Sequence, residues 1–122
     1  MARVAFTPGN LVIRVEGMDR IWALKSQLEI PLQHVIKAEA DTEIARGWWH
    51  GIRWPGTSIP GVVTAGTFYK DGQRMFWDVH NPERTVVIAL ADEDFSQLII
   101  EVENPTQTVE AINRAVAAAR AG

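Results

Sequence analysis

Cysteine is absent from this sequence of 122 residues, so disulfide bonds, thiolate metal sites, iron–sulfur clusters and thiol nucleophiles are excluded. No apolar run approaches the length of about eighteen residues that a membrane-spanning helix requires. The longest run, Val86 to Ala91, has six residues. The amino terminus also lacks the apolar segment of a secretory signal. We therefore expect a cytoplasmic protein.

An excess of positive charge is absent as well. Twelve basic residues stand against fifteen acidic residues, which leaves a formal net charge of −3. This balance argues against nucleic acid, phosphoinositides and membranes as partners, because anionic partners select basic surfaces. Hydrophobic residues make up 47% of the chain, which is enough to build the core of one domain over residues 1–122.

Patterns that carry catalysis or metal binding are missing too. The three histidines, His34, His50 and His80, do not stand at metal-ligand spacing. No glycine-rich stretch holds the lysine of a phosphate-binding loop, and no serine lies in a nucleophile elbow. We interpret Asp78 with His80 as a surface pair and the acidic run 92–94 as a solvated turn. We therefore predict no cofactor, no metal and no enzymatic activity.

Period-two alternation of apolar and polar residues, typical of half-buried strands, dominates the chain. Pro31 makes residues 28–32 suitable for a sheet edge or a crossing between sheets. Asp71-Gly72 predicts a tight hairpin turn. The nearly continuous apolar run that begins at Thr85 suits a strand covered on both faces. Seven strands are predicted over residues 11–16, 21–26, 34–41 (with Ile36, Ala38 and Ala40 on one face), 62–69, 74–80, 85–91 and 97–103.

The end of the chain follows a helical pattern instead. Asn104 suits an N-cap and Pro105 suits the first helical position. An apolar stripe at helical spacing then consists of Val109, Ile112, Val116 and Ala119. These features predict one amphipathic helix over residues 105–120. Seven antiparallel strands followed by this helix predict a mainly β fold, either two nearly orthogonal sheets or an open barrel capped by the helix.

This order of elements resembles the pleckstrin-homology superfold, and more closely the bacterial pleckstrin-homology-like domains. The resemblance rests on Leu28–Leu32 followed by His34–Glu39, on Thr85–Leu90, and on Leu98–Val102, which leads into the terminal helix. It implies a domain that binds lipids, peptides or proteins and does not catalyse a reaction. The turn Glu16–Arg20 holds two acids and one base, so phosphoinositide binding is not expected there.

One segment interrupts the strand pattern. Residues 47–61 contain four glycines, two prolines and three tryptophans, which predicts a long ordered loop. Three tryptophan rings left in water would forgo much burial, so they pack on something, and covering an open barrel corner is the first interpretation. Two others stay open. Tryptophan and arginine dominate binding hot spots, so the segment can recognise a partner, or the rings insert at a membrane interface. The candidate binding residues are Arg46, Trp48, Trp49, His50, Arg53 and Trp54.

These patterns lead to one main functional hypothesis and two alternatives. We expect a non-enzymatic module that recognises a protein, a peptide or a small ligand through the 47–61 segment. The first alternative is a structural protein that forms a homo-oligomer by pairing the strand edges at 28–32 or 62–69. The second is a carrier or enzyme with a pocket at the barrel mouth beside His50, Arg53 or Asp78.

Overall fold

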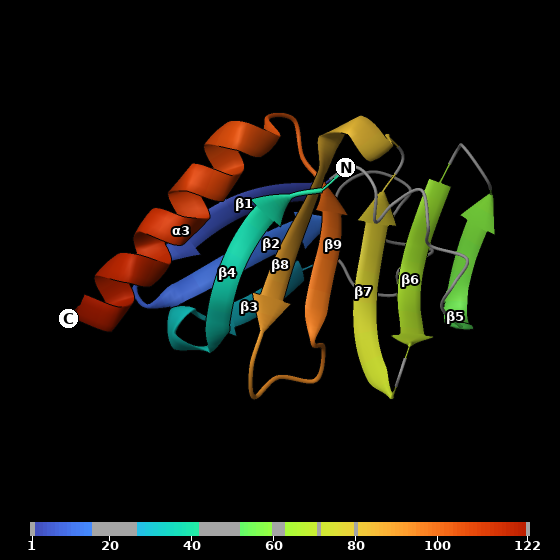
Figure 1. The fold of residues 1–122 in the computed structure, drawn as a ribbon, viewed down its shortest axis with the longest axis horizontal. Helices are drawn as coiled ribbons and strands as arrows, with labels where there is room; N and C mark the ends of the chain where they lie inside the picture. The colour runs from blue at the N-terminus through green and yellow to red at the C-terminus, as the bar shows by residue number, and fades with distance from the viewer. Residues whose placement is uncertain are drawn as a thin grey trace.

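The computed structural model describes residues 2–15, 27–41, 52–59, 63–70, 72–79 and 81–121. Its strands form two sheets, and one long helix follows them (Figure 1). The smaller sheet contains β1 (Ala2–Thr7), β2 (Asn10–Val15) and β3 (Gln27–Pro31) in that order. The larger sheet contains six strands in the order β4-β8-β9-β7-β6-β5.

The strands of the larger sheet are β4 (Val35–Ala40), β5 (Ile52–Ile59), β6 (Val63–Lys70), β7 (Gln73–Val79), β8 (Thr85–Leu90) and β9 (Gln97–Glu101). The short 3-10 helices η1 (Leu32–His34) and η3 (Pro82–Arg84) precede β4 and β8. Neighbouring strands run antiparallel except β7 and β9, which are parallel. The prediction of an all-antiparallel arrangement is therefore wrong, because β9 lies between β8 and β7 instead of continuing a simple meander.

Strands also occur where the sequence pattern predicts none. β1 pairs with β2, and β5 runs through the segment that was expected to be a loop. The loop prediction is wrong for residues 52–59, and seven strands are too few. Pro55 is tolerated because β5 is a terminal strand and its register with β6 shifts between Arg53 and Gly56. The predicted strand at 21–26 lies outside the described residues.

The two sheets lie as facing layers whose strands cross at a steep angle (Figure 1). Within the described residues no hydrogen-bonded strand pair joins one sheet to the other, so these strands do not form a barrel. β3 is an edge strand, and the chain crosses from it into the larger sheet through η1. There the N–H of Leu32 donates to the carbonyl of Gly9 at 2.9 Å. The prediction that Pro31 marks an edge or a crossing is confirmed.

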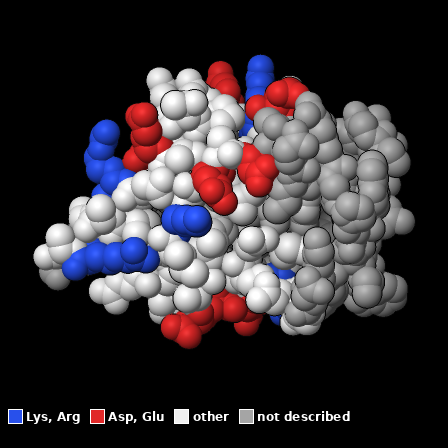
Figure 2. Space-filling model, viewed as in Figure 1, with Lys and Arg blue, Asp and Glu red and all other residues white. Residues whose placement is uncertain are grey.

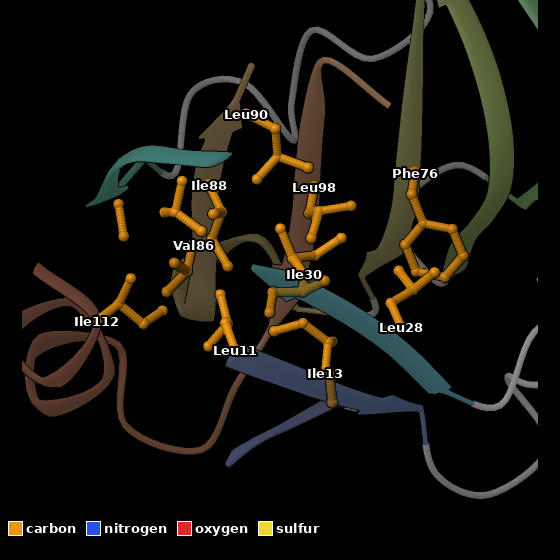
Figure 3. Close-up of a cluster of buried hydrophobic side chains, with 14 of the residues drawn as sticks. Leu11, Ile13, Leu28, Ile30, Phe76, Val86, Ile88, Leu90, Leu98 and Ile112 are labelled. Carbon is orange, nitrogen blue, oxygen red and sulfur yellow. The ribbon is translucent and has the colours of Figure 1, made fainter. Parts of the chain in front are cut away.

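The interior between the layers is apolar (Figure 3). Leu11 and Ile13 of β2 and Ile30 of β3 pack with β8 and β9. β8 is buried on both faces, as predicted. Val86 and Ile88 lie in this interior, and Val87 lies in a second buried cluster on the other face of the sheet. The opposite face of the larger sheet has its own buried cluster, formed by Met75, Trp77, Val79, Val87 and Ile99.

A bulge at the start of β4 changes which of its residues are buried. The register with β8 shifts between Val35 and Lys37. Val35 is fully buried, whereas Ile36 is 44% exposed. The prediction that Ile36, Ala38 and Ala40 lie on one face is therefore wrong for Ile36, because one extra residue before Ala38 reverses the alternation.

The terminal helix α3 (Pro105–Ala121) confirms the helix prediction. The N–H of Gln107 donates to Oδ1 of Asn104 at 3.2 Å, so Asn104 is the N-cap. Ile112 and Val116 are buried in the interior between the sheets, and the helix packs against β4 and η1. Among the described helices, none has the length and apolar character needed to cross a membrane.

We predict that Ile112→Ala lowers the free energy of unfolding by about 2–4 kcal/mol, because Ile112 is fully buried and the smaller side chain leaves a cavity. Urea denaturation followed by circular dichroism measures this loss. Arg114→Ala, on the exposed side of the same helix, should change stability by less than about 0.5 kcal/mol. Equal losses in the two variants would show that α3 does not depend on its buried stripe.

The turn between β6 and β7 confirms the hairpin predicted from Asp71-Gly72, since Lys70 pairs with Gln73. Gly72 has a φ of +77°, and a Cβ built on it has no atom within 4 Å. We predict that Gly72→Ala lowers the free energy of unfolding by about 1 kcal/mol through backbone strain alone. Gly72→Asn should cost less, because asparagine tolerates this conformation. Thermal unfolding checks both, and equal costs would contradict the strain explanation.

Candidate functional site

The two ends of the six-stranded sheet are built differently. At one end, α3 lies alongside the terminal strand β4 (Figure 1). The side-chain amide of Asn113 donates to the carbonyl of Ala38 at 2.9 Å and accepts the N–H of Ala38 at 2.9 Å. Arg120 donates to the carbonyls of Val35 at 3.0 Å and Ile36 at 3.3 Å. Side chains of the helix thus bind the N–H and C=O of Ala38 and the carbonyls of Val35 and Ile36.

This arrangement replaces a neighbouring strand. The primary amide of Asn113 presents one donor and one acceptor side by side, as a peptide group does. An unpaired edge would otherwise offer its N–H and C=O groups to another chain. Asn113 and Arg120 are seven residues apart and therefore lie on one side of the helix, beside the apolar stripe. That spacing is the only sequence signal for their role, and the helix prediction from the apolar stripe does not include it.

We predict that Asn113→Ala lowers the free energy of unfolding by about 1–2 kcal/mol, because the N–H and C=O of Ala38 lose their protein partners in a partly buried position. Chemical denaturation measures the change. Glu110→Ala, an exposed substitution on the same helix, serves as the control and should be nearly neutral. A neutral Asn113→Ala would mean that water replaces the amide without cost.

At the other end of the sheet, β5 is the terminal strand and β6 is its hydrogen-bonded neighbour. Within the described residues no strand or helix pairs with the outer edge of β5. Two of the candidate binding residues, Arg53 and Trp54, belong to this strand, and Arg53 stands opposite Phe68 of β6. The other four candidates lie outside the described residues, namely Arg46, Trp48, Trp49 and His50.

Charge is distributed unevenly along the chain. Residues 44–70, which include β5 and β6, contain three of the twelve basic residues and none of the fifteen acidic ones. This stretch therefore carries a formal charge of +3, and the rest of the chain carries −6. By contrast, the described part of the face that shows α3 and β4 has acidic and basic side chains interspersed (Figure 2).

Other chemistry-bearing residues have structural partners. The carboxylate of Glu101, only 5% exposed, accepts the N–H of Asn81 at 3.1 Å and so fixes the connection between β7 and β8. His34 Nδ1 and Glu93 Oε2 lie 2.5 Å apart and link η1 to the turn after β8. No group of three or more potential metal ligands occurs among the residues that the structure describes.

Two expectations about acidic residues have different outcomes. Asp78 is fully buried in β7, so its interpretation as a surface residue is wrong, because both faces of this strand are covered. His80 lies outside the described residues. The turn predicted at 92–94 is confirmed, with Asp92 at a φ of +60°.

Two strand edges were predicted to allow self-association, at residues 28–32 and 62–69, and the structure has an edge at only the first of them. Residues 63–70 form β6, which pairs with β5 on one side and β7 on the other, so they are not an edge. β3 is an edge, but it has five residues, ends in Pro31 and carries exposed Glu29. Short length, proline and charge are the features by which natural edges avoid pairing.

The chain has no significant match to a protein-family model, to a curated protein or to a solved structure.

Proposed function

We propose that this protein is a non-enzymatic binding module that recognises a protein or peptide partner through the β5–β6 hairpin. One observation carries the proposal. Arg53 and Trp54 occur in the terminal strand of the larger sheet, at the end opposite the edge that α3 closes. Arginine and tryptophan are the residue types that contribute most to protein–protein binding energy.

The surrounding scaffold supports this role. The larger sheet rests on an apolar interior, and β5 belongs to this sheet through its pairing with β6. The two sheets and the C-terminal helix agree with the coarse architecture of the pleckstrin-homology-like binding domains. We therefore also propose that the chain is a pleckstrin-homology-like domain and that it acts in the cytoplasm. The strand count and the parallel β7–β9 pair are departures from the arrangement that the resemblance implies.

We predict that the full chain enriches specific sequences from a displayed library of short linear random peptides, and that Arg53→Glu weakens their binding by about tenfold or more. Trp54→Ala should have a similar effect. Fluorescence polarisation with labelled copies of the enriched peptides measures the dissociation constants. Absence of enrichment would overturn the proposed function.

Lys37→Glu is the matched control, because it makes the same change of charge at an exposed position of β4. It should leave binding within about twofold of wild type, since charge contacts outside the binding surface contribute little. Equal weakening by Arg53→Glu and Lys37→Glu would indicate general electrostatic attraction, with no defined site on the hairpin.

A further inference from the structure

We infer that the outer edge of β5 accepts an acidic, extended segment of a partner protein as an additional strand of the larger sheet. This inference rests on the proposed function and specifies its mode of recognition and the chemistry of the partner. It follows from the direction in which the backbone N–H and C=O groups of β5 point, from the position of Pro55 and from the charge of the β5–β6 hairpin.

The side of each strand that a residue's N–H and C=O face can be traced from β7 through β6 to β5. The carbonyl of Arg74 accepts the N–H of Ser96, so the backbone of Arg74 faces the β9 side of β7. Its opposite residue in β6, Tyr69, therefore directs its own backbone groups away from β7 and toward Ile52 of β5. Because the direction alternates along an antiparallel strand, the N–H and C=O of Arg53 point to the outer edge.

The second half of β5 follows the same rule. The β6–β7 register continues without a shift, and Gly56, Thr57 and Ser58 stand opposite consecutive residues of β6. Alternation then places the backbone groups of Thr57 toward β6 and those of Gly56 and Ser58 toward the outer edge. The outer edge of β5 thus presents the N–H groups of Arg53, Gly56 and Ser58.

Pro55 lies in the bulge between these positions and not on them. It removes an N–H where the register shifts and leaves the outward N–H groups of Gly56 and Ser58 able to donate. Gly56 has no side chain, which permits close approach of another backbone. At the β4 end, the corresponding outward groups of Ala38 already bind Asn113. The two terminal strands therefore differ in whether a described element occupies their edge.

The charge of the hairpin selects the partner. β5 and β6 contain Arg53 and Lys70 and no acidic residue. An added strand with carboxylate side chains would gain cross-strand attraction to Arg53 of the neighbouring β5, whereas a basic strand would be repelled by it. A second copy of this chain is a poorer occupant, because it would place two basic hairpins side by side without a compensating carboxylate.

The test uses a synthetic peptide of alternating glutamate and valine, with capped ends, and the lysine–valine peptide as the charge control. We expect the acidic peptide to bind the full chain and the basic peptide to bind at least about tenfold more weakly, with an affinity that falls as salt rises. Ser58→Pro, which removes an outward N–H, should weaken binding by about tenfold, the equivalent of roughly one backbone hydrogen bond. Ser58→Ala keeps that N–H and should bind like wild type.

Hydrogen exchange measured by NMR gives a second result that does not require a variant to fold. Binding should slow exchange at the amides of Arg53, Gly56 and Ser58 and leave Ile52 and Thr57 unchanged. If enriched library peptides bind and depend on Arg53 but these three amides are not protected, the strand-addition mode is overturned while the proposed function stands. Protection of the same amides in a dimer formed without peptide would assign the edge to a second copy and overturn the inference.

Discussion

The requirement that backbone N–H and C=O groups find partners decides how the β4 edge of the larger sheet is built. At the β4 end, α3 meets this requirement with one asparagine and one arginine, and Ile112 and Val116 bury the adjacent apolar stripe. Polar and apolar contacts of one helix thus stabilise each other, because neither is in place unless α3 is docked. The docked helix contacts β4, β8 and η1 and so joins the larger sheet to the crossing between the sheets.

Local patterns were sufficient to predict the elements that are locally determined. The capped helix, the Asp-Gly hairpin and the doubly buried strand β8 all follow from residues within one short window. The pairing of β9 between β8 and β7 does not, because period-two alternation says which face a residue occupies and not which strand lies beside it. The same limit explains Ile36, whose exposure depends on a single bulge.

The candidate site was only partly accessible from the sequence. The tryptophan and arginine residues indicated the region of β5 as a binding site. Its glycine and proline residues led to the prediction of a loop, although Arg53 and Trp54 belong to a strand. Tertiary pairing with β6 overrides weak strand propensity there. The contribution of Asn113 was concealed for the opposite reason, since a polar residue on a helix surface looks like an ordinary solvated one until the neighbouring strand is known.

The insertion of β9 between two earlier strands also constrains the order of assembly. β7 and β8 are close in sequence, yet each keeps an unpaired edge until residues 97–101 enter between them. During synthesis on the ribosome, the centre of this sheet therefore stays open until residues 97–101 emerge. Non-local pairing of this kind slows folding and prolongs the exposure of aggregation-prone edges. The parallel β7–β9 pair thus ties completion of this sheet to the arrival of residues 97–101.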